Sequence, residues 1–163
     1  MLLFLSFAAC AFAADDPYAS LRLYDGTWES RGADPQKVDR LTDRCADVGN
    51  YFVCQQTVNG KTAALLVFVP AGDAGHFYVQ NILPYGHASG RGELRIDGDR
   101  WTFSSSREES GKKTFYRTVN VFTGTDRIHS DSAVSTDGEH WTVTRTGELI
   151  RVSAQQQTPV KRR

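Results

Sequence analysis

The chain has 163 residues with 19 basic and 19 acidic side chains, so its formal net charge is zero at pH 7. This length suits a single domain built around one hydrophobic core. Because no charge excess would attract phosphate groups or anionic lipids, we expect neither a nucleic acid nor a membrane surface as a partner.

The first residues of the chain form an uncharged, almost wholly apolar segment that ends in Ala11-Phe12-Ala13. Signal peptidase requires this small-x-small pattern, so we interpret residues 1–13 as a secretory signal peptide. The apolar run is too short for a transmembrane helix, which needs about 20 residues, and no other run is long enough. We therefore expect an exported protein, periplasmic in a bacterium or secreted.

Cys10 allows another interpretation of this segment, because a Cys after small residues can be the lipid-modified first residue of a bacterial lipoprotein. The branched aliphatic residue expected three positions earlier is Phe7 here, so this alternative fits less well. The positively charged start of most signal peptides is also missing, which leaves the true start codon open.

The mature part of the sequence has the pattern of an all-β protein. Runs rich in β-branched and aromatic residues alternate with turn residues about every eight to twelve positions. A short helical turn is expected within residues 15–23, with Asp16 as its cap and Pro17 at its first position. Strands are then expected at residues 26–30, 38–48, 51–58, 62–69, 76–82, 90–96, 100–107, 113–122, 127–134 and 140–152.

Turn chemistry and strand polarity together favour a closed sheet. Gly49-Asn50 and Asn59-Gly60 suit tight hairpin loops. The strand at 62–69 is apolar on both faces, whereas the strands at 113–122 and 127–134 mix polar residues into both, and a sheet curled on itself explains this combination. We predict one domain at residues 14–152, an antiparallel up-and-down β-barrel of about eight to ten strands. A disordered polar and basic tail is expected at residues 153–163.

The hairpin around Gly49-Asn50 fixes a register between two strands. With a two-residue loop, positions whose numbers sum to 99 face each other, and this places Cys45 opposite Cys54. The pair is a non-hydrogen-bonded one, where side chains approach most closely, so we predict a disulfide. In the alternative the two thiols are catalytic or bind a metal, but their spacing across a hairpin matches neither a zinc knuckle nor a redox pair.

No catalytic or metal-binding motif stands out. The histidines at positions 76, 87, 129 and 140 form no His-x-His or HExxH pattern, and neither a nucleophile elbow nor a phosphate-binding Gly-rich loop is present. His129 and Asp131 share one strand face, where they would make either a proton relay, half a metal site or, more simply, a solvated pair. We therefore expect no enzyme activity, no metal and no cofactor.

Polar side chains interrupt two otherwise apolar strands, and they are the candidate ligand-binding residues. If they point into a barrel, Arg117 or Tyr116 would orient the polar head of a ligand within an apolar cavity. The alternative is that they face outward from a sheet with one solvated side. The candidates are Tyr78, Gln80, Tyr116, Arg117 and Asn120.

A Gly-x-Trp motif, Gly26-Thr27-Trp28, opens the first strand directly after the helical turn. With the turns at residues 97–101 and 135–141, it resembles the calycin superfamily, which includes the lipocalins, and in particular exported bacterial lipocalin-like barrels. The resemblance implies that Trp28 closes one end of the barrel beneath a basic residue of the last strand, with Arg145 or Arg151 as the counterpart. The chain departs from typical lipocalins because its predicted disulfide lies within one early hairpin.

The resemblance implies an internal cavity but identifies neither a ligand nor an oligomeric state. We predict that the protein binds a small apolar or amphipathic molecule inside the barrel. The alternative is a protein-binding module, such as an inhibitor of a periplasmic hydrolase, that would use the loops at residues 70–75 and 84–89. An open cavity with apolar walls favours ligand binding, whereas a filled interior with a protruding apolar loop favours the inhibitor.

Overall fold

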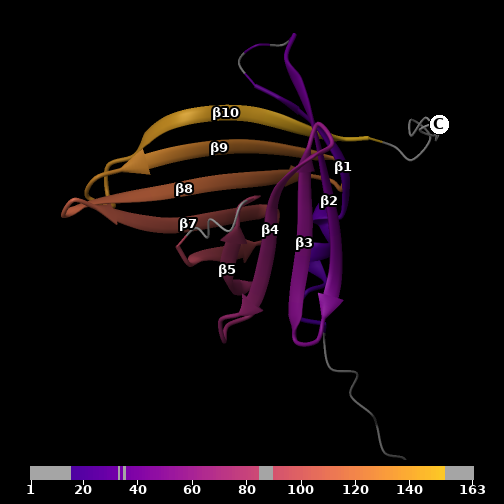
Figure 1. The fold of residues 1–163 in the computed structure, drawn as a ribbon, viewed down its shortest axis with the longest axis horizontal. Helices are drawn as coiled ribbons and strands as arrows, with labels where there is room; N and C mark the ends of the chain where they lie inside the picture. Colours follow the sequence, from indigo (N-terminus) through magenta and orange to yellow (C-terminus); the bar gives the residue numbers. More distant parts are fainter. Residues whose placement is uncertain (1–15, 33, 35, 85–89, 153–163) are drawn as a thin grey trace, which may run out of the picture.

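The computed structural model describes residues 16–32, 34, 36–84 and 90–152, which form a β-barrel with one short 3-10 helix (Figure 1). The signal peptide expected at residues 1–13, which contains Cys10, and the tail expected at 153–163 lie outside these residues. So does most of the loop at 84–89. The helix in the described part of the chain is neither long nor apolar enough to span a membrane.

The helix η1 (Ser20–Tyr24) precedes ten strands. They are β1 (Gly26–Arg31), β2 (Val38–Val48), β3 (Tyr51–Val58), β4 (Lys61–Pro70), β5 (His76–Ile82), β6 (Gly92–Asp97), β7 (Arg100–Glu109), β8 (Lys112–Thr123), β9 (Arg127–Ser135) and β10 (Thr142–Arg151).

Every strand pairs antiparallel with its neighbours in the chain, and β1 also pairs with β10, so the sheet closes into a barrel. The predicted up-and-down topology is therefore confirmed. In Figure 1 the strands β2–β4 cross the direction of β8–β10. Closure pairs the first and last strands, which would otherwise present their backbone groups as sheet edges.

The strand limits follow the local sequence. The strands β2, β3 and β5 begin and end at the predicted residues, whereas β10 begins at Thr142 instead of His140. Asp137 causes this difference, because its Oδ1 accepts hydrogen bonds of 2.8 Å from the backbone N–H groups of both Glu139 and His140. Because these two N–H groups donate to the Asp137 side chain within a turn, they do not donate to the neighbouring strand, and β10 starts after them.

The N-terminal helical turn is present, but its helix begins later than predicted. Ala19, not Asp16, is the N-cap residue of η1, but Oδ1 of Asp16 accepts a hydrogen bond of 2.9 Å from the backbone N–H of Tyr18. This bond stabilises a turn before Ser20, where η1 begins. Tyr18 and Leu21 are buried, and the Tyr18 ring lies 5.6 Å from that of Phe52. The segment therefore packs against one end of the barrel, which we call the covered end.

The predicted hairpin register is confirmed. Val48 pairs with Tyr51 across the loop at 49–50, and Gly49 has a φ of +60°, as a tight loop of this kind requires. The same register places Cys45 opposite Cys54, and their sulfur atoms are bonded at 2.04 Å.

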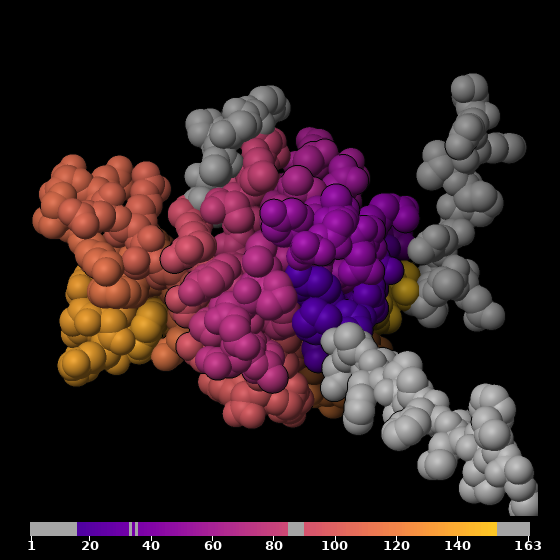
Figure 2. All heavy atoms as spheres, turned by 90° about the horizontal axis from the view of Figure 1, so that it is seen from below, coloured from indigo at the N-terminus to yellow at the C-terminus, as the bar shows by residue number. Residues whose placement is uncertain are grey.

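The largest buried side chains fill the covered end. Because the strands alternate in direction, the turns at 49–50, 71–75, 98–99 and 124–126 lie at this end with η1, while the turns at 59–60, 110–111 and 136–141 lie at the other, the open end. Figure 2 shows the β7–β8 hairpin and the start of β10 projecting from the body. The side chains that are almost inaccessible to solvent are Leu21, Trp28, Phe52, Cys54, Phe68, Leu94, Trp101 and Ile128.

Candidate ligand-binding cavity

A cavity of about 430 Å³ lies inside the barrel above this core. Its volume falls within the range of about 300–1,000 Å³ that is typical of small-molecule sites. The apolar part of the lining is formed by Tyr24, Trp28, Leu41, Leu66, Phe68, Val79, Phe103 and Leu149. The polar part includes Ser30, Asp43, Gln56, Asn81, Glu93, Ser104, Ser105, Tyr116, Arg117, Thr118, Asn120, Ser130, Ser132 and Arg145.

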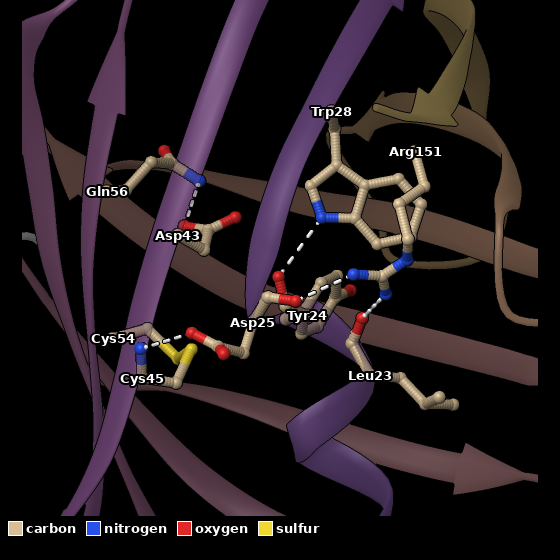
Figure 3. The surroundings of a disulfide bond; sticks show 9 residues. All are labelled: Leu23, Tyr24, Asp25, Trp28, Asp43, Cys45, Cys54, Gln56 and Arg151. Carbon is tan, nitrogen blue, oxygen red and sulfur yellow. Dashed lines mark hydrogen bonds between the residues drawn. A yellow bond between two sulfur atoms is a disulfide. The ribbon is translucent and has the colours of Figure 1, made fainter. Parts of the chain in front are cut away.

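Trp28 closes the end of the cavity that is nearer the covered end of the barrel, and we call this the lower end of the cavity. Trp28 is only 1% exposed. Its Nε1–H group donates a hydrogen bond of 3.0 Å to the backbone oxygen of Tyr24 (Figure 3). The guanidinium carbon of Arg151 lies 4.1 Å from the centre of the Trp28 ring. Of the two arginines that the calycin resemblance implied as the counterpart of Trp28, Arg151 is the one that lies over the ring. Arg145 is exposed and lines the cavity instead.

Arg151 also holds the main chain around the Gly-x-Trp motif. Its Nη1 donates to the backbone oxygen of Asp25 at 2.7 Å, its Nε donates to that of Thr125 at 2.8 Å, and its Nη2 donates to that of Leu23. Gly26 has a φ of +134°, and a Cβ atom at this position would lie 2.6 Å from Nη1 of Arg151. The motif therefore requires glycine both for the backbone conformation and for the space that the guanidinium group occupies.

Asp43 is a buried carboxyl group in the cavity wall, with an exposed fraction of 5%. Gln56 Nε2 donates a hydrogen bond of 3.1 Å to its Oδ1 (Figure 3). Burial raises the pKa of Asp43 to about 6, although the Gln56 hydrogen bond lowers it, and the nearby charge of Asp25 raises it further. None of the ion pairs among the described residues includes Asp43. The site therefore contains a buried acid without a compensating cation.

A second polar group at the lower end joins η1 to β8. Asn120 Nδ2 donates a hydrogen bond of 2.7 Å to the hydroxyl oxygen of Tyr24. Asn120 is 9% exposed, and within the described part of the chain its Oδ1 has no hydrogen-bond partner. The Tyr24 ring packs edge-on against Trp101, with 5.0 Å between ring centres. Burial raises the pKa of Tyr24 far above its usual value, so this hydroxyl stays neutral.

The structure brings three of the five predicted ligand-binding residues to the cavity, namely Tyr116, Arg117 and Asn120. Tyr116 is 41% exposed. The guanidinium carbon of Arg117 lies 4.1 Å from the centre of the Trp141 ring, so the two side chains form a cation–π contact.

Tyr78 and Gln80 are absent from the described lining, and the inward position expected for them is not observed. Val79 and Asn81 of the same strand line the cavity, so alternation along β5 turns Tyr78 and Gln80 to the outer face. There the guanidinium carbon of Arg91 lies 4.3 Å from the centre of the Tyr78 ring. The sequence already indicated this orientation, because Phe77 and Val79 are apolar and alternate with Tyr78 and Gln80 along the strand. The apolar positions are the ones that face the interior.

Asp43 and Gln56 were not among the binding residues predicted from the sequence. Their numbers sum to 99, and they lie two positions from Cys45 and Cys54 along the same two strands, so the predicted register already placed them opposite each other. Two positions along a strand return to the same face, which puts Asp43 and Gln56 on the side of the disulfide. Since Cys54 is fully buried, a carboxyl group on that side is also buried.

His129 and Asp131 lie on the outer face of β9, away from the described cavity lining. His129 Nδ1 lies 2.6 Å from Glu148 Oε1, and its Nε2 lies 3.3 Å from Asp131 Oδ2. The Glu148 hydrogen bond raises the pKa of His129. All three side chains are more than one-third exposed, as in a solvated cluster. No group of three or more His, Cys, Asp and Glu side chains in the described ranges is placed to hold a metal ion.

The two loops considered as contacts for a protein partner lie at opposite ends of β5. Residues 70–75 connect β4 to β5 at the covered end, and Leu83 and Pro84 begin the next connection at the open end. The seven residues of β5 extend over about 23 Å. The two connections therefore start at opposite ends of the barrel.

Comparisons with known proteins identify the fold but no family. No protein-family model matches the sequence, and comparison with curated proteins found no match. The crystal structure of Rv2717c from M. tuberculosis is similar, with 15% sequence identity and a TM-score of 0.50, and the match covers 84% of this chain and 98% of that chain. At this identity the similarity concerns the fold alone. The chain is therefore a ten-stranded antiparallel β-barrel, an architecture compatible with the calycins.

Proposed function

We propose that the protein binds a small amphipathic molecule in the interior of its barrel. The cavity of about 430 Å³ carries this proposal. Its walls are apolar at Leu41, Leu66 and Phe103, and polar groups lie at its lower end and near the open end. A few fixed polar groups in an apolar pocket are the usual composition of a small-molecule site.

We further propose that the protein acts after export, in the periplasm or outside the cell. The apolar segment at residues 1–13 supports export. The Cys45–Cys54 disulfide supports maturation in an oxidising compartment, since cytosolic thiols are kept reduced. A hydrolase inhibitor fits the same compartment, but the unfilled interior and the separation of its two candidate loops favour the ligand-binding role.

Native mass spectrometry of the protein purified from its own host tests the binding role. We expect a mass above that of the mature chain, and a small molecule in the extract after denaturation. Ser130→Trp places an indole ring in the cavity lining and should abolish this extra mass. Ser106→Trp, at an exposed position of β7, is the matched control and should retain it.

The same proteins should also be tested with the neutral apolar dye Nile red. We expect the wild type and Ser106→Trp to bind the dye, and Ser130→Trp to bind it at least about tenfold more weakly, a difference of about 1.4 kcal/mol. If the native mass equals that of the mature chain alone and the protein also fails to bind Nile red, the proposal is contradicted.

A further inference from the structure

The lower end of the cavity presents hydrogen-bond acceptors without matching donors. Gln56 occupies Oδ1 of Asp43, and no hydrogen bond to Oδ2 is found within the described residues. Asn120 uses its amide N–H on Tyr24, which leaves its Oδ1 buried and unpartnered. Buried acceptors without donors are costly, so a ligand that supplies N–H groups would stabilise this end of the cavity.

Both acceptors belong to the lining of the same cavity. Asn120 is hydrogen-bonded to the Tyr24 hydroxyl. The charge of Asp43 is close enough to contribute to the raised pKa of Tyr24. Both acceptors are therefore available to a ligand that enters the cavity.

The charge of Asp43 distinguishes among ligand heads that can donate hydrogen bonds. With a pKa of about 6, Asp43 is mostly ionised at neutral pH. The arginines of the lining lie elsewhere, since Arg117 stacks on Trp141 and Arg145 is exposed. A buried carboxylate without a cation is unfavourable, and a positive charge from the ligand would offset its desolvation.

We propose that the barrel selects amphipathic amines, whose protonated amino group is held at the lower end of the cavity by the Asp43 carboxylate. This inference rests on the proposed ligand-binding role. The ammonium group donates up to three hydrogen bonds, so it can bind Oδ2 of Asp43 and still donate to other acceptors of the lining. The hydrocarbon part of the ligand lies along Leu41 and Phe103, which are nearer the open end along their strands than Asp43 and Asn120 are.

Displacement of Nile red by decylamine, decanol and decanoic acid tests the selectivity for the head group, because the three molecules share one hydrocarbon chain. At pH 7.5 we expect decylamine to displace the dye at a concentration at least about tenfold lower than either competitor. In Asp43→Asn, which keeps the shape of the side chain, this preference should disappear while decanol still competes. Glu93→Gln is the matched control, because Glu93 is a half-exposed carboxylate that lies opposite the outward-facing Tyr78 and pairs with His76, and it should keep the preference.

A pH series on the wild type tests the same proposal without a mutation. Between pH 7.5 and pH 4.5 Asp43 becomes neutral, so the preference for decylamine over decanol should fall by about tenfold or more. The groups near Asp43 are Gln56, which does not titrate, Asp25 and Tyr24. Decylamine stays protonated over the whole range, so its own titration does not contribute.

The results separate this inference from the proposed function. If Nile red and all three decyl compounds fail to bind, the ligand-binding role itself is wrong. If the dye binds and decanol or decanoic acid competes as well as decylamine, the barrel binds amphipathic molecules but the selectivity for amines is overturned. A preference for decylamine that persists in Asp43→Asn or at pH 4.5 also overturns it.

Discussion

Arg151, the last residue of β10, lies directly opposite Trp28 of β1, and its guanidinium group stacks on the indole ring 4.1 Å from the ring centre. The pair lies at the seam where the barrel closes. From this position Arg151 also binds the backbone oxygen of Leu23, in the last turn of η1, and that of Thr125, in the turn between β8 and β9. One side chain therefore joins the helix, the first strand and a distant turn at the covered end.

We expect Arg151→Lys to lower the free energy of unfolding by about 2 to 3 kcal/mol. Lysine keeps the charge but loses the planar fork that serves several carbonyl oxygens and stacks on Trp28. Urea unfolding followed by tryptophan fluorescence measures the change. Arg145→Lys on the same strand is the control and should change stability by less than about 0.5 kcal/mol. Equal stabilities for the two variants would refute the role given to Arg151.

Gly26→Ala should be among the most destabilising small substitutions in the barrel. The added methyl group meets Nη1 of Arg151 at 2.6 Å, and the backbone φ of +134° is unfavourable for alanine. We expect a loss of about 2 to 4 kcal/mol, measured by thermal and urea unfolding. Gly98→Ala, at a φ of +57° with open space around the position, should cost only about 1 kcal/mol. A Gly26→Ala variant as stable as Gly98→Ala would contradict the steric argument.

Removal of the disulfide should lower the free energy of unfolding by about 2 to 3 kcal/mol, because the bridge restricts a loop of about ten residues in the unfolded chain. The double variant Cys45→Ala/Cys54→Ala should show this loss in urea unfolding. Reduction of the wild type should reproduce it, while the double variant should not respond to reductant. A thiol titration that finds two free sulfhydryl groups in the native mature protein would rule out the bridge.

Asp43 should make the stability of the barrel depend on pH. Its pKa is about 6 in the folded protein against 3.8 for an unperturbed aspartate, so between these values the unfolded chain releases a proton that the folded chain keeps. Stability from this group is therefore fully present below about pH 4 and is lost as pH rises through about 6, with a total of about 3 kcal/mol.

Urea unfolding from pH 4 to pH 8 tests this prediction with Asp43→Asn as the comparison. The amide cannot ionise, so the variant should gain stability relative to the wild type as the pH rises, by up to about 3 kcal/mol at pH 8. Stability curves that stay parallel over this range would show that Asp43 titrates at its ordinary pKa.

His129 should titrate above the usual histidine range, because its hydrogen bond with Glu148 stabilises the protonated ring. An NMR titration of the histidine resonances measures this pKa directly. Glu148→Gln should move the His129 pKa back toward 6.5. The charge pair contributes to stability below about pH 6.5, and this contribution is lost as pH rises through the His129 pKa of the folded protein. A pKa unaffected by Glu148→Gln would contradict the contact.

The amino-acid sequence by itself determined the features that depend on neighbouring strands. The strand positions follow from runs of β-branched and aromatic residues between turn residues, and the Cys45–Cys54 disulfide follows from the two-residue loop at 49–50. Hairpin register also paired Asp43 with Gln56, because pairing across a tight loop is a local property of the chain.

Only the tertiary structure decided which side chains line the interior of the barrel and how burial changes their chemistry. The approach of Asn120 to Tyr24 joins residues far apart in the chain, and the raised pKa of Asp43 results from burial that exists only in the closed barrel. In β10 the register shifts between Val143 and Arg145, so that Val143 pairs with Ala133 but Arg145 pairs with Ser132 of the cavity lining. A bulge of this kind reverses the alternation of inward and outward positions, and no local pattern marks it. Burial, strand closure and bulges depend on contacts between distant segments, and these contacts set the size and polarity of the cavity.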